Sequence, residues 1–222
     1  MFLLLSNVFC LSCVSPTPLE IDTGDLIEGP QLWITLSWDE ANSWPVGAGN
    51  QLWLEAAALS VGGVQFIPCL DFNAETNSAD ELTIELNLSE DLVVLRSMSL
   101  GPYAFPIVEI CEIYFWYGPT QTLTTEWPVA FHGASSLALI GEWGGSPANA
   151  SSLRLYSSES FGRRVRLEEP ILLSGTQDYR LTLYRDRQFM LWPELLASGD
   201  GDAFLETMVR ETQLTLQINT VE

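Results

Sequence analysis

Residues Tyr103–Gly118 read YAFPIVEICEIYFWYG, and the fold of the chain is organised around this stretch. Alternate positions place mostly β-branched and aromatic side chains on both of its faces. One face carries Phe105, Ile107, Glu109, Cys111, Ile113, Phe115 and Tyr117, and the other carries Val108, Ile110, Glu112, Tyr114 and Trp116. This pattern predicts a strand that is covered on both sides rather than an amphipathic edge strand. Cys111 lies in the middle of the stretch and is expected to tie it to a second strand.

The composition indicates a packed globular chain with an acidic surface. Of its 222 residues, 47% are hydrophobic, and 29 acidic residues against nine basic ones give a net charge of −20. All nine basic residues are arginines, and the first is Arg96. Such a charge repels phosphate backbones and anionic bilayers, so we expect no nucleic-acid partner. The acidic surplus favours solubility, and a surface that collects divalent cations through carboxylate oxygens is the alternative.

The N-terminal segment is typical of an exported protein. Phe2–Leu11, FLLLSNVFCL, is an uncharged apolar run that is too short to span a bilayer, which takes about 20 residues. It fits the apolar core of a secretory signal. The sequence CLSC at residues 10–13 then precedes a tether rich in Ser, Pro, Thr and acidic residues, and this order resembles a bacterial lipoprotein signal. In that family the cysteine, here Cys13, becomes the lipidated first residue of the mature protein. A plain cleaved signal is the alternative.

The lipoprotein resemblance implies a membrane location. Acyl chains on Cys13 would hold the protein on a bilayer with about 0.8 kcal/mol per buried methylene group. Val14 is not the acidic residue that signals retention at the inner membrane, so the resemblance implies the outer membrane or the cell surface. We divide the chain into a signal at residues 1–13, a flexible tether at residues 14–30 and a single β-sandwich domain at residues 31–222.

Two cysteines belong to the domain, and each lies at an apolar strand position. An exported chain meets an oxidising compartment, so a disulfide between Cys69 and Cys111 is expected. Two buried free thiols are the alternative if the chain is not exported. Metal binding by this pair is not expected, because neither a CxxC motif nor a nearby histidine accompanies it.

Apolar residues at alternate positions predict further strands along the domain. These segments are Gln31–Trp38, Leu82–Leu88, Leu92–Leu100, Ser135–Trp143, Leu153–Ser157, Arg163–Leu167, Tyr179–Arg185 and Thr212–Ile218. The arginines of the segments between residues 153 and 185 are expected on the solvent face.

Glycines predict two turns. Gln51–Val61, Gly62-Gly63 and Val64–Cys69 are interpreted as a β-hairpin, because paired glycines supply the positive φ of a two-residue turn. Gly101-Pro102 is expected to turn the chain into the central strand.

One helix is predicted near the C-terminus. Asp202 is a suitable N-cap, and Phe204, Leu205, Met208 and Val209 form an apolar stripe at helical spacing. Together with nine or ten strands separated by turns, this pattern predicts an all-β fold, an antiparallel β-sandwich with one short C-terminal helix.

The sequence contains no catalytic signature. His132 is the only histidine, no G-x-S-x-G elbow is present, and its strand-and-turn context offers no group to orient a catalytic base. A hydrolase that uses His132 is therefore the weaker hypothesis, and we expect a loop histidine and no enzyme activity.

Acidic residues near the helix offer an alternative role in metal binding. Asp200 and Asp202 have a D-x-D spacing that could supply oxygens to Ca²⁺, but the other ligands of an EF-hand loop are missing. A glycine-rich turn that caps the helix at Asp202 explains the same residues. With His132, these two aspartates are the candidate metal ligands, for copper or calcium.

Aromatic residues in expected loops are candidate contacts for a partner. Trp44, Trp127 and Trp192 each precede a proline. Exposed indoles can stack on a glycan or contact a protein, and they can equally close the ends of a sandwich. The loops Glu40–Asn50 and Asp186–Asp202 are expected to face such a partner.

Several segments resemble the MbnP-type family of methanobactin-associated, copper-binding periplasmic proteins. They are LEAAALSVGGVQFIPC, SLGPYAFPIVEICEIYFWYGP, SSLALIGEW, RVRLEEPILL and YRLTLYRDRQFMLWPELL with DAFLETMV, and they lie within residues 51–215. The resemblance implies a β-sandwich in an exported lipoprotein. That family holds copper with histidines and an oxidised tryptophan, and this chain has the single histidine His132, so the resemblance does not extend to a copper site.

These observations lead to one expectation about function. We expect a lipid-anchored, extracytoplasmic β-sandwich with a non-catalytic binding or structural role. A periplasmic protein that binds copper or calcium is the alternative.

Overall fold

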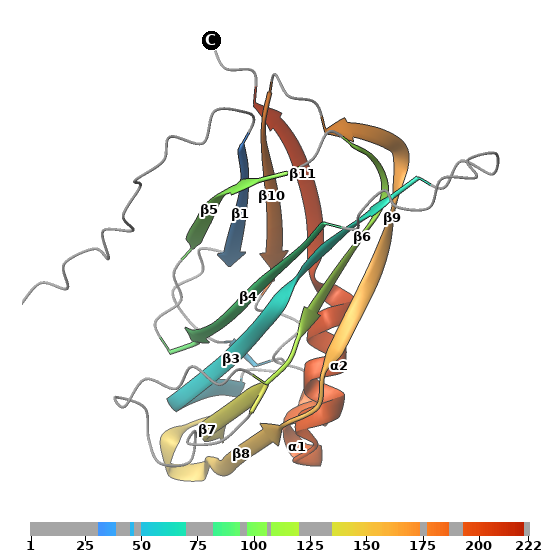
Figure 1. Ribbon diagram of the computed structural model, residues 1–222. Helices are drawn as coiled ribbons and strands as arrows, with labels where there is room; N and C mark the ends of the chain where they lie inside the picture. The colour runs from blue at the N-terminus through green and yellow to red at the C-terminus, as the bar shows by residue number, and fades with distance from the viewer. Residues whose placement is uncertain are drawn as a thin grey trace, which may run out of the picture.

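The described part of the chain has an all-β fold, with two sheets packed face to face as a β-sandwich and two helices beside them (Figure 1). The computed structural model describes residues 31–38, 45–46, 50–69, 82–93, 97–105, 108–119, 135–173, 177–186 and 193–219. The predicted signal and tether lie outside these residues.

The smaller sheet has four strands in the order β11-β10-β1-β5. They are β1 (Gln31–Trp38), β5 (Met98–Ala104), β10 (Asp178–Arg185) and β11 (Gln213–Asn219). β1 pairs with β10 in parallel, whereas the other pairings described in both sheets are antiparallel. Leu32, Ile34 and Leu36 alternate inward along β1, as predicted for an amphipathic strand.

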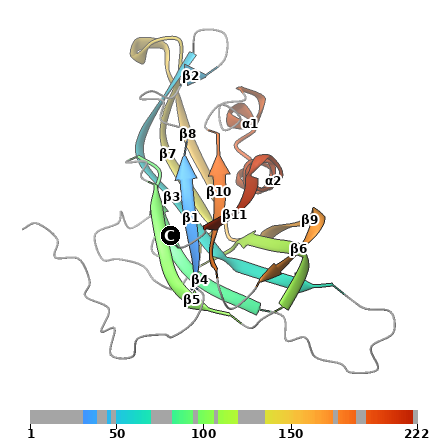
Figure 2. The same ribbon diagram turned by 90° about the horizontal axis from the view of Figure 1, so that it is seen from above.

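The larger sheet has seven strands, and its order is β8-β7-β3-β6-β9, with β2 and β4 also paired to β3. They are β2 (Pro45–Val46), β3 (Asn50–Pro68), β4 (Leu82–Asp91), β6 (Val108–Tyr117), β7 (Leu137–Gly144), β8 (Ser151–Ser157) and β9 (Phe161–Leu173). A short 3-10 turn, η2 (Pro147–Asn149), connects β7 to β8. Figure 2 shows this sheet curving around the smaller one, with both helices on its concave side.

The helices are α1 (Pro193–Ser198) and α2 (Gly201–Glu211). The predicted stripe on α2 is confirmed, because Phe204, Leu205, Met208 and Val209 are buried in the core shared by both sheets. α1 was not predicted, and it lies within the segment interpreted as the loop Asp186–Asp202. Its six residues are too few for a helical period to stand out in the sequence.

The predicted hairpin at Gly62-Gly63 is wrong, because β3 runs through both glycines as one strand of 19 residues. The register with β4 and β6 shifts between Val61 and Gly63, which marks a bulge. A Cβ atom at either glycine would overlap the indole of Trp116 on the neighbouring strand. These glycines therefore allow the Trp116 ring to lie close to β3, and they do not form a turn.

The central stretch is divided between two strands rather than forming one. β5 ends at Ala104 and β6 begins at Val108. Gly101-Pro102, a cis peptide, lies inside β5 and not at a turn. The segment Leu92–Leu100, predicted as one strand, has a bend at residues 92–93 and contains the start of β5 at Met98.

The inward face of β6 changes along its length. Ile113, Phe115 and Tyr117 are buried, whereas at the other end of the strand Ile110 is buried, because the register shifts between Ile110 and Glu112. The opposite face is only half-buried at Tyr114 and Trp116. One face of the strand is therefore core, and the other is partly open to solvent.

Candidate functional site

The structure places only some of the residues that the sequence singled out. Asp200 and Asp202 are described, and both are exposed. The remaining candidates lie outside the described residues: Cys13, Trp44, Trp127, His132 and Trp192.

The aspartate pair forms a helix cap. The carboxylate of Asp200 accepts hydrogen bonds from the backbone N–H groups of Asp202 (3.1 Å) and Ala203 (3.0 Å), so the N-cap is Asp200 and not Asp202 as predicted. The helix begins at Gly201, two residues earlier than an N-cap at Asp202 implies, and a Cβ atom at Gly201 would overlap the backbone of Tyr156. Within the described part of the chain, no three His, Cys, Asp or Glu side chains come together as a metal site. Metal binding at Asp200, Asp202 and His132 stays a prediction.

The predicted disulfide between Cys69 and Cys111 is confirmed. It joins the residue after β3 to β6, with the two Cα atoms 4.9 Å apart and the cysteines 42 positions apart in sequence. Beside it, the N–H group of Cys69 donates a hydrogen bond of 2.9 Å to the carbonyl of Glu109.

A buried charged cluster, which we call the Arg185 cluster, lies where four strands end and comprises Trp38, Glu90, Tyr117, Arg185 and Thr212. Arg185 is fully buried and Glu90 is 5% exposed. The guanidinium donates two parallel hydrogen bonds to the carboxylate, and the one from Nη2 to Oε1 is 2.8 Å long. The guanidinium carbon also lies 4.1 Å from the centre of the Trp38 ring.

The bidentate contact explains how two charges remain in the interior. A buried ion pair is tolerated when good geometry and further hydrogen bonds replace the lost hydration. Both carboxylate oxygens of Glu90 are used. Among the described residues Nε of Arg185 has no hydrogen-bond partner, and the guanidinium lies over the Trp38 ring. The pair therefore fixes the ends of β1, β4 and β10 relative to one another.

Tyr117 extends the cluster to helix α2. The Thr212 hydroxyl donates to the carbonyl of Met208 at 2.8 Å, so the Tyr117 hydroxyl is the donor in its 3.3 Å hydrogen bond to Thr212. Burial raises the pKa of Tyr117 above its usual value of 10.0, although the charge of Arg185 acts in the opposite direction. Burial alone would lower the pKa of Arg185, but Tyr117 and Glu90 outweigh it and raise that pKa.

The raised pKa of Tyr117 predicts a loss of stability at alkaline pH. The unfolded chain releases the phenol proton near pH 10 and the folded chain at higher pH, so this contribution is complete below pH 10 and is lost as pH rises above it. Replacing Tyr117 by Phe should cost about 1 kcal/mol at pH 7 through the lost hydrogen bond and should flatten the decline above pH 10. Urea unfolding between pH 7 and pH 11 measures both effects. Tyr156→Phe, which changes a ring 43% exposed on β8, should follow the wild-type curve. An equal decline for Tyr117→Phe and the wild type would contradict the assignment.

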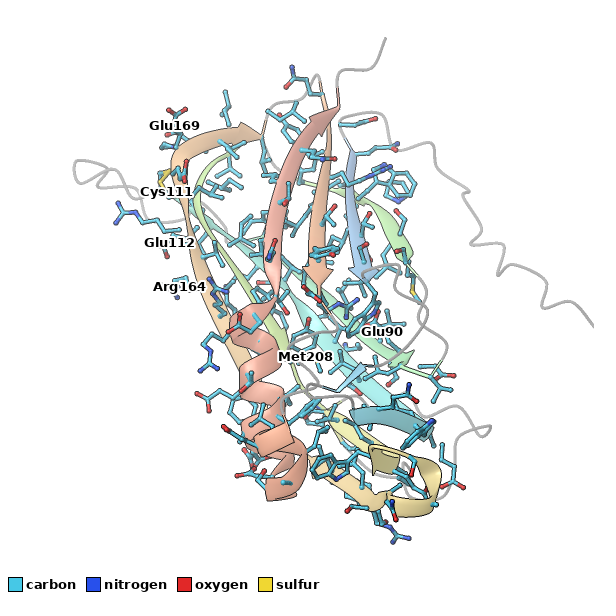
Figure 3. The ribbon with its side chains drawn as sticks, turned by 180° about the vertical axis from the view of Figure 1, so that it is seen from behind. Glu90, Cys111, Glu112, Arg164, Glu169 and Met208 are labelled. Carbon is cyan, nitrogen blue, oxygen red and sulfur yellow. A yellow bond between two sulfur atoms is a disulfide. The ribbon has the colours of Figure 1, made fainter. Side chains whose placement is uncertain are left out.

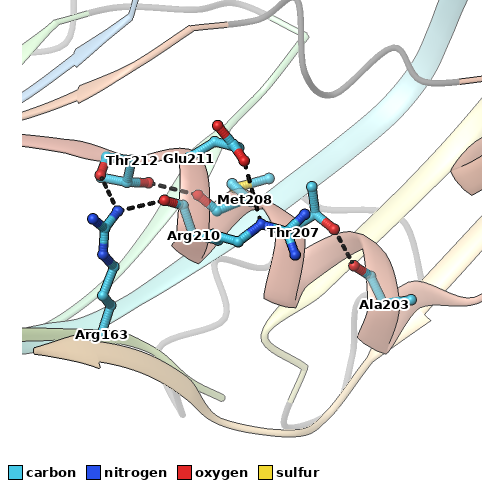
Figure 4. Close-up of polar contacts among 7 residues, drawn as sticks. All are labelled: Arg163, Ala203, Thr207, Met208, Arg210, Glu211 and Thr212. Carbon is cyan, nitrogen blue, oxygen red and sulfur yellow. Dashed lines mark hydrogen bonds and ion pairs between the residues drawn. The ribbon is translucent and has the colours of Figure 1, made fainter.

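The C-terminal end of α2 is held by β9 (Figure 4). Arg163 donates from Nη1 to the carbonyls of Arg210 and Thr212, the second at 3.3 Å. A cation at the C-terminus of a helix satisfies free carbonyls and complements the helix dipole. The cluster, the helix and the larger sheet thus form one connected unit. Glu90 of β4 and Met208 of α2, both labelled in Figure 3, are buried in it.

Three segments outside the described residues start beside the Arg185 cluster. The chain leaves the described part after Trp38, after Pro119 and after Asp186, each at or within two residues of a member of the cluster. The sequences of these segments hold the candidate residues Trp44, then Trp127 and His132, then Trp192. The four candidates therefore belong to segments that begin at one end of the sandwich.

Ser60 contacts the described residues on either side of residues 120–134. Its carbonyl accepts from the N–H group of Gly118 (3.2 Å), and its own N–H group donates to the carbonyl of Ser136 (2.8 Å). Its hydroxyl donates to the carbonyl of Ser135 at 3.0 Å. The chain therefore leaves and rejoins the described fold at one place on β3.

Sequence reasoning missed the Arg185 cluster, because all arginines of this region were expected to face solvent. That expectation is confirmed for Arg154, Arg164 and Arg180 and is wrong for Arg185. A signal was present, because Arg185 continues the inward series Tyr179, Leu181 and Leu183. Glu90 carries no such signal, since it lies 95 residues away and its neighbours are polar.

Comparison of the chain with protein-family models, with curated proteins and with solved structures gives no match. None of the helices in the described part is long and apolar enough to cross a membrane.

Proposed function

We propose that the chain is a lipid-anchored, extracytoplasmic β-sandwich with a non-catalytic binding role. The observation that carries the proposal is the disulfide between Cys69 and Cys111, which joins two strands of the larger sheet. Disulfides persist in oxidising compartments and are rare where thiols are kept reduced. A structural disulfide therefore supports export of the chain, which the apolar run at Phe2–Leu11 also predicts.

The Arg185 cluster supports a binding role for one end of the sandwich. Binding residues are commonly carried by loops that a rigid scaffold positions. Here Trp38, Tyr117 and Arg185 are tied to one another just before the segments that hold Trp44, Trp127, His132 and Trp192. We infer that these segments contact the partner, and that the buried ion pair keeps their starting points at fixed separations.

Lipidation is tested by replacing Cys13 with serine. The variant should leave the membrane fraction of a Gram-negative host and should no longer incorporate a labelled fatty acid, because the thiol that takes the acyl chain is gone. Cys10→Ser is the matched control, since it removes a cysteine of the same segment, three residues before the proposed site, and should stay in the membrane fraction. If Cys13→Ser stays with the membrane as firmly as Cys10→Ser, the lipid anchor at Cys13 is excluded.

A further inference from the structure

Two aromatic rings lie on the outer face of the larger sheet. Tyr114 and Trp116 alternate with the buried side chains of β6 and are half-buried, and neither belongs to the core between the sheets. Their ring centres are 5.7 Å apart, and their planes differ by 17°. The two rings are stacked with nearly parallel planes, and we call this pair the aromatic platform.

Glycines of both neighbouring strands let the rings rest on the sheet. A Cβ atom at Gly62 or Gly63 of β3 would overlap the indole of Trp116, and a Cβ atom at Gly162 of β9 would overlap the phenol of Tyr114. Each ring thus lies close to the backbone of a neighbouring strand, while both side chains keep part of their surface exposed.

The side chains around the platform are polar and balanced in charge. Arg164 of β9 is 63% exposed and lies 3.5 Å from the carboxylate of Glu112, which is 27% exposed. Figure 3 shows both side chains on the outer side of the molecule, away from Met208. Arg166, opposite Glu112 on β9, and Glu85, opposite Gly63 on β4, are also exposed. Two arginines and two glutamates leave this area neutral on a chain of net charge −20.

We propose that the aromatic platform binds an uncharged, β-linked polysaccharide through two neighbouring pyranose rings. The C–H groups on the flat face of a pyranose fit the electron-rich face of an aromatic ring, and two nearly parallel rings suit a chain whose sugar faces are flat. Glu112 and Arg164 supply an acceptor and donors for hydroxyl groups at the edge of the platform. A polyuronate is disfavoured, because the area has no surplus of positive charge and the whole chain repels polyanions.

Affinity electrophoresis of the purified full chain tests this proposal. The protein migrates strongly toward the anode because of its charge, and a polysaccharide that binds it in the gel slows this migration. The probes are hydroxyethylcellulose and glycol chitin as neutral β-linked polymers, and polygalacturonate as the charged polymer. At least one neutral polymer should slow the wild type. Trp116→Ala and Tyr114→Ala should each weaken its binding about tenfold.

Two further variants separate binding from folding. Arg164→Ala changes an exposed side chain, should keep the wild-type unfolding temperature, and should weaken binding about fivefold. Tyr156→Ala removes an exposed ring of the same sheet outside the platform and should bind like the wild type. The proposal is overturned if neither neutral polymer slows the wild type, if only polygalacturonate does, or if the Tyr114, Trp116 and Arg164 variants bind like Tyr156→Ala.

The inference depends on the proposed binding role and not on the lipid anchor. A negative result for Cys13 would not affect the proposal that the aromatic platform binds a polysaccharide. A negative result in electrophoresis would not affect the proposal of a lipid anchor. If the platform variants lose stability without any effect on binding, the rings serve only to cover the glycine backbone.

Discussion

Replacing Arg185 with methionine is expected to lower the free energy of unfolding by about 3–5 kcal/mol, because it leaves the carboxylate of Glu90 buried without a counter-charge. Glu90→Gln should be destabilising for the reciprocal reason, since it leaves a buried guanidinium. Urea unfolding at pH 7 measures both changes. Stability of typical domains is only about 5–15 kcal/mol, so either variant should unfold at clearly lower urea concentration.

The double variant Arg185→Met/Glu90→Leu separates the net contribution of the ion pair to stability from the destabilisation caused by leaving one buried charge unpaired. Replacing a buried ion pair by apolar side chains of similar volume is often neutral or stabilising. We therefore expect the double variant to be more stable than either single variant, which gives a large coupling energy in the double-mutant cycle.

The exposed pair Arg164–Glu112 is the matched control for this cycle. It also joins two strands, but its side chains are 63% and 27% exposed. Arg164→Met should cost about 0–1 kcal/mol. A cost for Arg185→Met no greater than that for Arg164→Met would show that the Arg185 cluster does not hold the strand ends together.

Removal of the disulfide is the second large effect. Cys69→Ala/Cys111→Ala should lower the free energy of unfolding by about 4 kcal/mol, because opening a loop of 42 residues restores conformational freedom to the unfolded chain. Urea unfolding with and without a reducing agent measures the change. The reductant should destabilise the wild type by a similar amount and leave the double variant unchanged. A wild type that is indifferent to reductant would contradict this account of its stability.

Local patterns in the sequence predicted much of the fold. The alternation at Gln31–Trp38 and Leu82–Leu88 gives strands β1 and β4, and the stripe from Phe204 to Val209 gives α2. These predictions succeed because a strand or helix that covers a core repeats its apolar residues with the period of its own backbone. The disulfide was predictable because only two cysteines belong to the domain.

The errors come from contacts between residues far apart in the chain. Gly62-Gly63 has the composition of a hairpin turn, and the ring that requires these glycines belongs to Trp116 on another strand. The parallel pairing of β1 with β10 joins segments separated by most of the domain. Neither contact leaves a local period in the sequence.

The candidate site was predicted less well than the fold for the same reason. Arg185 has the inward position of an apolar residue, and its distant partner Glu90 makes that position tolerable for a charge. The roles assigned to Trp44, Trp127, His132 and Trp192 stay predictions. The structure shows only that the last described residues before their segments belong to the Arg185 cluster or lie within two residues of it.

The central claim is that this β-sandwich is an exported protein, stabilised by a disulfide between Cys69 and Cys111. Its most direct test is disulfide mapping on protein from cells lysed in an alkylating agent. Because the chain has no lysine and its first arginine is Arg96, trypsin cuts between the two cysteines and places Cys111 in the peptide 97–154. The account predicts that this peptide is recovered linked to the peptide that ends at Arg96. Recovery of both peptides separately, with Cys69 and Cys111 alkylated, would contradict it.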